Sequence, residues 1–254
     1  MKKSISGRRK FLASSVAGLG ALSLERASPV EQNSQPKKLK VVCVGAHPGD
    51  PEFGCGGTMA RYSDAGHDVY FLYVTRGEAS DPSKTHDQMA ALRTKEAEVA
   101  CVLLKSKPLF VGQIDGDTSL NKSSVRSFQK LLLAQSPDVV FTQWPVDGHQ
   151  DHQVAGMLTL NAWTSVKRRF HLYFYEVNTG SETMAFTPTD YVDITAVRER
   201  KKQALMAHKT QDPENTYNDF FAPLETFRGL EAGVKAAEAF VYFKPDMRSD
   251  TIGL

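Results

Sequence analysis

Cysteine is scarce in this chain, and its few cysteines show no paired spacing. The 254 residues contain 3 cysteines, Cys43, Cys55 and Cys101, and no Cys-x-x-Cys sequence occurs. A disulfide framework or a thiolate metal site needs cysteines at characteristic spacings. The sequence therefore argues against both, and we expect three small buried side chains.

A transmembrane-length apolar run is also lacking. The apolar run at residues 11–22 is shorter than the roughly 20 residues that span a bilayer, and basic residues precede it. This order is typical of a signal peptide. We expect residues 1–27 to be a signal peptide of the twin-arginine type, because Arg8-Arg9 and their neighbours resemble that export motif; an uncleaved anchor is the alternative. The predicted location is outside the cytoplasm of a bacterium, periplasmic or extracellular.

Basic residues form no stripe in the remainder of the chain. The formal net charge of +2 comes from 31 Lys/Arg and 29 Asp/Glu, and residues 1–27 hold 6 of the basic and 1 of the acidic residues. The mature part therefore carries 25 basic and 28 acidic residues, a net charge of −3. Neither nucleic acid nor a membrane is indicated as a partner, and the oligomeric state stays open.

A complete dinucleotide-binding motif is missing as well. The segment Gly54-Cys55-Gly56-Gly57 lacks the third glycine of Gly-x-Gly-x-x-Gly, so we expect no nicotinamide cofactor. We expect these glycines to let the first helix pack closely against the sheet, with the preceding loop left open.

Apolar runs alternate with helical patterns along residues 39–254. Residues 28–38, rich in Ser, Pro, Gln and Lys, are expected to be a linker to this single domain. The alternation predicts an α/β fold, a Rossmann-like and mostly parallel sheet flanked by helices in three layers. Segment 239–243 is expected to be an edge strand, and segments 79–86 and 212–223 to be loops that shape a pocket. Strands are expected at 40–46, 68–75, 109–112, 138–143, 172–177 and 191–194, and helices at 55–65, 87–104, 123–134, 151–166 and 197–207.

Two clusters of His and Asp follow apolar runs. His47 and Asp50 follow the first strand, and His149, Asp151 and His152 follow the fourth. Side chains at the carboxyl ends of parallel strands meet in one crevice. Zinc binds imidazole nitrogen and carboxylate oxygen, and catalytic zinc sites use three protein ligands. The clusters predict such a site; the alternative for the two later histidines is that they cap the helix beginning near Asp151.

These segments resemble the PIG-L/LmbE-like zinc-dependent de-N-acetylases, whose motifs read Ala-His-Pro-Asp-Asp-Glu and His-x-Asp-His. The resemblance implies a zinc hydrolase that removes an acetyl group from an N-acetylated amino sugar or glycoconjugate. It implies Zn²⁺ ligands at His47, Asp50 and His152. It also implies a catalytic acid or oxyanion stabiliser at His149, with Asp151 behind it, and substrate binding by Arg93 and Asp115. From the sequence alone, Arg93 could equally pair with Glu96 on a helix surface, and Asp115 could simply belong to a turn.

One position departs from the family pattern. Gly49 stands where the family carries the Asp that serves as general base, and a missing base typically costs about 10² to 10⁴ in rate. Glu52, Asp147, Asp151 or water activated by the metal could substitute. The alternative function is therefore a catalytically weak or inactive metal-containing carbohydrate-binding relative. If the missing carboxylate limits catalysis, restoring Asp at this position should raise the rate about tenfold or more. No gain is expected if the backbone there requires glycine, or if another acid such as Glu52 already occupies the space of the base.

Overall fold

The computed structural model describes residues 37–167 and 170–244. The predicted signal peptide and all but the last two residues of the predicted linker lie outside these residues. The compact unit that contains the described helices and strands spans Lys38–Leu254. Within the described ranges, no helix is both long and apolar enough to cross a bilayer.

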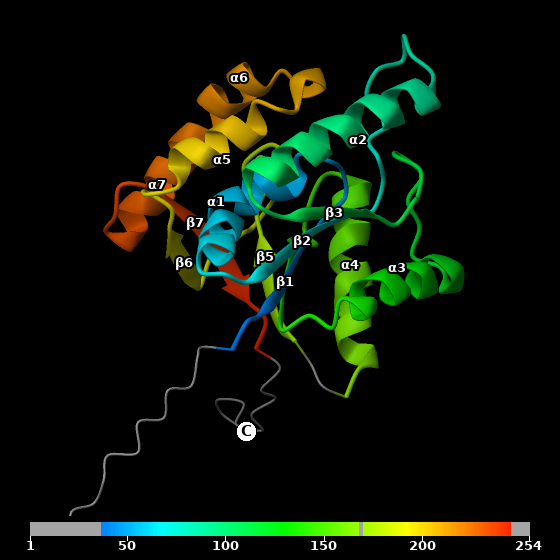
Figure 1. The fold of residues 1–254 in the computed structure, drawn as a ribbon, viewed down its shortest axis with the longest axis horizontal. Helices are drawn as coiled ribbons and strands as arrows, with labels where there is room; N and C mark the ends of the chain where they lie inside the picture. Colours follow the sequence, from blue (N-terminus) through cyan, green and yellow to red (C-terminus); the bar gives the residue numbers. More distant parts are fainter. Residues whose placement is uncertain (1–36, 168–169, 245–254) are drawn as a thin grey trace, which may run out of the picture. The chain divides into compact units, whose positions relative to one another are not determined.

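The described residues form one sheet of seven strands in the order β3-β2-β1-β4-β5-β7-β6 (Figure 1). The first five strands are mutually parallel, and β7 runs antiparallel to both β5 and β6. The strand order reverses between β1 and β4, which is where ligands bind in open α/β sheets. The strands are β1 (Lys40–Gly45), β2 (Asp68–Tyr73), β3 (Lys107–Phe110), β4 (Val139–Gln143), β5 (His171–Tyr175), β6 (Asp190–Asp193) and β7 (Ala237–Tyr242).

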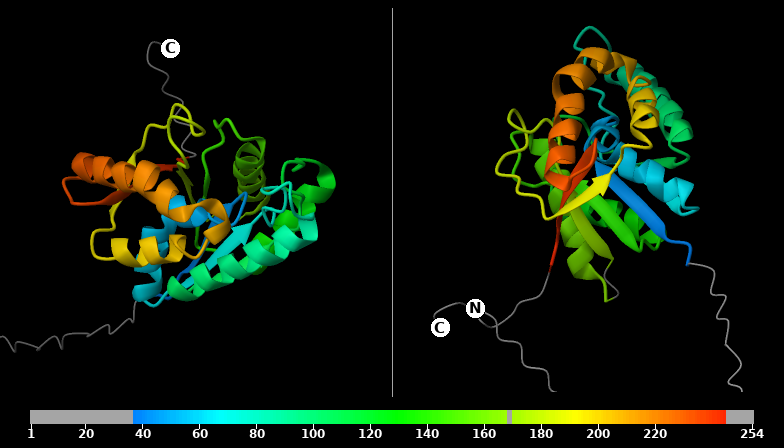
Figure 2. Two further views of the ribbon diagram at one scale, coloured as in Figure 1. Left: turned by 90° about the horizontal axis from the view of Figure 1, so that it is seen from above. Right: turned by 90° about the vertical axis from the view of Figure 1, so that its left-hand side faces the viewer.

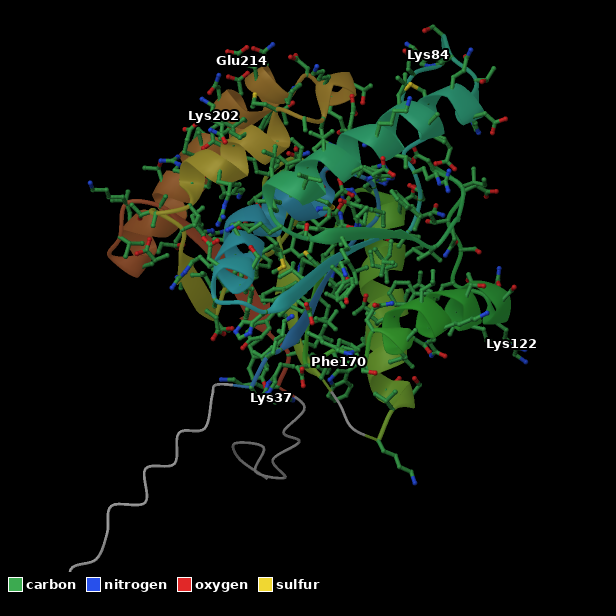
Figure 3. All side chains as sticks on the ribbon, in the orientation of Figure 1. Lys37, Lys84, Lys122, Phe170, Lys202 and Glu214 are labelled. Carbon is green, nitrogen blue, oxygen red and sulfur yellow. The ribbon has the colours of Figure 1, made fainter. Side chains whose placement is uncertain are left out.

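Helices cover both faces of the sheet, which confirms the predicted three-layer α/β architecture (Figures 1 and 2). Alternate residues of β1 enter different cores: Val41 packs in the cluster that contains α1, α2 and α5, while Val42 packs in the cluster of α3 and α4. Lys84, Lys122 and Glu214 project away from these layers (Figure 3). The helices are α1 (Asp50–Asp64), α2 (His86–Leu103), α3 (Lys122–Ala134), α4 (Gln150–Ser165), α5 (Arg198–Leu205), α6 (Pro213–Thr216) and α7 (Ala222–Ala232).

The glycine segment lies inside α1, which begins at Asp50 and not near Cys55 as predicted. A Cβ atom at Gly54 would lie 2.2 Å from the Tyr175 ring, and one at Gly57 would lie 2.6 Å from Ile194. Only glycine permits this close approach, so the predicted packing role of these residues is confirmed. The helix start was misplaced because glycine has a low helix propensity.

Two predictions for the C-terminal third were wrong. The expected edge strand, β7, lies between β5 and β6, and the short, charged β6 forms the edge. The expected loop at 212–223 is mostly helical, because α6, the π-helical segment η2 (Tyr217–Phe221) and α7 follow one another. Pro213 and Pro223 both lie in the first turn of a helix, where proline is tolerated.

Candidate metal centre

The candidate ligands lie in, or in the helix turn just after, two loops at the point where the strand order reverses. The first connects β1 to α1, and the second connects β4 to α4. Gln143, the last residue of β4, ties them together: its Oε1 accepts the Ala46 N–H at 2.7 Å, and its Nε2 donates to Asp50 Oδ2 at 3.2 Å. The parallel pairing of β1 and β4 thus brings together residues that are about a hundred positions apart.

The structure brings His47, Asp50 and His152 together. One potential ligand atom from each lies within 4.8 Å of the other two. Asp50 Oδ2 lies 3.1 Å from His47 Nδ1 and 3.4 Å from His152 Nε2. Two imidazole nitrogens and one carboxylate oxygen at such separations are a donor set that suits Zn²⁺ and other divalent transition metals.

Each candidate imidazole ligand has a carboxylate behind it. His47 Nε2 lies 3.0 Å from both Asp115 Oδ1 and Asp151 Oδ2, and His152 Nδ1 lies 3.2 Å from Asp147 Oδ1. In metal sites, such partners fix the tautomer and orientation of the ligand ring. The second nitrogen of each ring is therefore left for a metal, which is the arrangement a metal centre requires.

The carboxylates also make the site strongly attractive to positive charge. Burial alone would lower the pKa of His47, but Asp50, Asp115 and Asp151 raise it well above its ordinary value. Burial would also lower the pKa of His152, but Asp50 and Asp147 raise it above its ordinary value. Because protons and metal ions compete for the same nitrogens, the negative charge that favours protonated rings would equally favour a divalent cation.

His149 lies beside the candidate ligands and begins α4. Its ring is stacked on that of His152, with centroids 4.6 Å apart and planes 16° apart. His149 Nδ1 accepts the Asp151 backbone N–H at 3.2 Å, so this histidine does cap the helix, whereas His152 lies in the first turn. The capping alternative is therefore correct for one of the two histidines.

Asp151 does not occupy the place expected for it behind His149. Its carboxylate accepts hydrogen bonds from Thr118 Oγ1 at 2.6 Å and the Gly116 N–H at 2.8 Å, and it contacts His47 Nε2. The α4 backbone turns this side chain toward the loop after β3. Asp151 therefore supports a candidate metal ligand, and its main-chain N–H is what holds the His149 ring.

A polar cleft of about 310 Å³ opens above these residues. Arg93 and Asp115, the predicted substrate-binding residues, both line it. The Arg93 guanidinium is buried and donates to the carbonyl oxygens of Pro48 at 2.7 Å and Gly77 at 3.1 Å. The alternative of a surface pair with Glu96 is wrong; the Arg93 side chain instead braces the loop that carries the first ligands.

Five further residues line the cleft: Ala79 and Ser80 belong to the segment 79–86 that was expected to shape a pocket, and the other three were not predicted. Asn178 and Glu182 follow β5, and Gln211 follows α5. Ligand-binding side chains follow the carboxyl ends of parallel strands, which is how the loops after β1 and β4 were identified. The same reasoning applies to β5, which lies next to β4. Applied there, it would have pointed to the loop of Asn178 and Glu182.

The acids proposed as substitutes for the missing base are all engaged elsewhere. Glu52 is fully buried, and its carboxylate accepts from Tyr73 Oη at 2.5 Å and the Gly49 N–H at 3.1 Å. Asp147 accepts from the His149 N–H at 2.8 Å, as well as supporting His152. Beside Asp50, the carboxylates that line the cleft are those of Asp115 and Glu182.

Gly49 itself has a backbone conformation that disfavours a side chain. Its φ is 110° and its ψ is −45°, and a Cβ atom there would lie 3.4 Å from the Phe53 ring and 3.7 Å from Gln211. L residues rarely adopt this φ. The absence of the family aspartate is thus accompanied by a local backbone suited to glycine.

Comparison with known proteins agrees with this geometry. Residues 42–163 match the family model described as PIG-L: GlcNAc-PI de-N-acetylase. The diacetylchitobiose deacetylase of Thermococcus kodakarensis is 26% identical over 217 residues, which cover 78% of this chain and 81% of that protein. The solved structure of the N,N'-diacetylchitobiose deacetylase from Pyrococcus horikoshii has a TM-score of 0.72 and 25% identity, covering 80% of this chain and 83% of that one.

A different activity also occurs on this fold. The 4-carboxy-2-hydroxymuconate hydratase from Pseudomonas putida has a TM-score of 0.73 at 18% identity, covering 84% of this chain and 99% of that one. That likeness concerns the fold alone, and fold does not fix reaction. Together, the sheet and its His/Asp cluster define an α/β protein with a candidate divalent-metal centre. Residues 42–163 of this chain carry the PIG-L family match, and the Thermococcus and Pyrococcus relatives named above are deacetylases.

Proposed function

We propose that this protein is a zinc-dependent hydrolase that removes the acetyl group from an N-acetylated amino sugar or glycoconjugate. The observation that carries the proposal is the convergence of His47, Asp50 and His152 in a polar cleft, beside a third imidazole, that of His149. The names of the relatives, which are deacetylases of N-acetylated sugars, support the same reaction class.

A bound zinc ion would polarise the amide carbonyl and make a water molecule a better nucleophile. The protein side chains would do the rest. Asp147 would hold His152 in the ligating orientation, and Asp115 and Asp151 would hold His47. Arg93 would keep the loop of His47 in place through its bond to the Pro48 carbonyl.

The tautomer of His149 follows from its capping bond. Because Nδ1 accepts the Asp151 N–H, the neutral ring carries its hydrogen on Nε2. That hydrogen is available to stabilise the developing oxyanion or to protonate the departing amine. His149 is therefore our candidate for the catalytic acid.

The direct test measures acetate released from N-acetylglucosamine and N,N'-diacetylchitobiose by zinc-loaded protein. We expect release by the unmodified chain and a loss of about 10² or more in His149→Ala, in the range that general acid catalysis supplies. Thr164→Ala, an exposed substitution near the end of α4, is the control and should keep full activity. No acetate from any N-acetylated sugar would refute the proposal.

The substitute base is sought among the two acids that line the cleft beside Asp50. Glu182→Gln and Asp115→Asn would each be compared with the unmodified protein in a pH–rate profile. Loss of the acidic limb in one variant identifies that residue as the base. If both profiles keep this limb, neither acid accepts the proton, and activation of water rests on the metal alone.

A second candidate function is favoured by Gly49. A metal-containing carbohydrate-binding protein with little or no turnover would tolerate the loss of the base. Saturable sugar binding with no acetate formed over hours, at full zinc occupancy, would support this alternative over the hydrolase.

We further propose that the protein acts outside the cytoplasm of a bacterium. The support is the paired Arg8-Arg9 ahead of an apolar run. Replacing both arginines with lysine should keep the protein in the cytoplasm, and unchanged export in a fractionation experiment would argue for another route.

A further inference from the structure

A second groove of about 280 Å³ adjoins the metal cleft. It lies between the loop after β5 and the helical run of η2 and α7. Asn178 lines both the cleft and the groove, so the two form one continuous surface. Together they fall inside the range of about 300–1,000 Å³ that is typical of small-molecule sites, which leaves room for more than one sugar ring.

Two exposed aromatic side chains contribute to the apolar part of this groove. Phe220 is 51% exposed and Phe227 is 53% exposed. Leu224 lies between them on the same helical face. Large apolar side chains gathered in a groove are typical of binding surfaces, and here they have no covering element among the described residues.

The helix is locally adapted at this point. Tyr217–Phe221 is π-helical, and the α-helix resumes at Ala222. A π-helical turn inserts an extra residue and often occurs at functional sites. Phe221 stacks on Phe53 of α1, with ring centroids 4.3 Å apart, and is buried, while its neighbour Phe220 is left in the groove. The segment thus anchors Phe221 and presents Phe220.

Polar groups accompany the two rings. Asp219 and Thr179 line the groove, and Asn178 stands at its junction with the cleft. Asn178 Nδ2 donates to Glu182 at 3.0 Å, but its Oδ1 is buried and accepts no hydrogen bond from the described residues. The Asn178 side chain therefore marks the junction of the cleft and the groove.

We propose that this groove binds a second sugar residue, linked to the N-acetylated residue held in the metal cleft. The aromatic faces would cover the apolar C–H face of a pyranose ring. The Asp219 carboxylate would accept from its hydroxyl groups, and Asn178, which lines both the cleft and the groove, would lie beside the linkage between the rings. This inference rests on the proposed function and specifies its substrate class as an oligosaccharide with at least two residues.

The test compares a disaccharide with a monosaccharide. Titrations of N,N'-diacetylchitobiose and N-acetylglucosamine into the zinc-loaded protein would be followed by saturation-transfer NMR, which reports binding and any acetate formed in one sample. We expect Phe220→Ala/Phe227→Ala to weaken disaccharide binding about tenfold or more and to leave monosaccharide binding unchanged. Asn178→Asp should also weaken the disaccharide, because it adds a charge at the junction.

The matched control is Leu230→Ala. Leu230 lies on α7, is 75% exposed, and does not line the groove, so this variant should bind both sugars normally. Equal loss of affinity for both sugars, or no loss for the disaccharide, would overturn the inference. The inference would also be overturned if a phenyl glycoside of N-acetylglucosamine stacks on the two rings and the protein shows no preference for the disaccharide. Selective disaccharide binding without acetate release would support the groove and refute the hydrolase.

Discussion

Replacement of Gly49 by aspartate restores the residue that the family carries, yet the structure predicts no gain. At φ 110° and ψ −45°, any L side chain is strained, and such backbone strain costs about 1–3 kcal/mol. For a domain of this size that corresponds to a fall in Tm of roughly 2–12 °C. The new Cβ would point toward Phe53 and Gln211, and the carboxylate would lie near the charge of Asp50.

Gly49→Ala separates the two effects, because it imposes the same backbone strain without a carboxylate. We expect both variants to lose similar stability in thermal unfolding of the zinc-loaded protein. We expect kcat of Gly49→Asp to stay within about threefold of that of Gly49→Ala, since a general base in place would supply about 10² or more. A tenfold higher kcat in the aspartate variant, or an unchanged Tm in both, would show that the loop accommodates a base and that this reasoning is wrong.

Four other outcomes are expected. His152→Ala should lose zinc while His149→Ala retains it, as measured by elemental analysis; equal loss would mean that both are ligands. Asp147→Asn should weaken zinc binding about 10- to 100-fold, and an unchanged affinity in equilibrium dialysis would rule out its supporting role. The raised pKa of His47 and His152 means that protons compete from above pH 6.5, so zinc affinity should fall as the pH is lowered from 8.5 to 5.5; a flat profile would contradict the assigned ligands. Burial raises the pKa of Cys101 to about 12, so it should not react with a thiol reagent at pH 8 until the protein is unfolded.

The groove of Phe220 and Phe227 gives the chain a way to discriminate substrates without altering the metal centre. The cleft is lined mainly by charged and polar groups, whereas the groove adds aromatic surface on a separate helix. Binding energy gained away from the reacting amide can be used for orientation at the reacting centre. A monosaccharide would not gain the binding energy that the groove supplies.

The sequence alone was sufficient for the fold class and for the residues that meet at the centre. Buried runs such as Val41–Val44, separated by helical patterns, require parallel strands with helices on both faces, and this placed the loops of His47 and His152 at one edge of the sheet. Local patterns carry that information because strand direction fixes which ends of the strands coincide.

The partners of these residues were decided by tertiary packing. Asp151 is adjacent to His152 in sequence, yet its carboxylate contacts His47, which is 104 residues away. Glu52 lies near the ligands along the chain but is turned inward to Tyr73. The helical segment with Phe220 was expected to be a loop. Side-chain direction depends on the helix phase and on what packs against it, and no local pattern in the sequence fixes either of them.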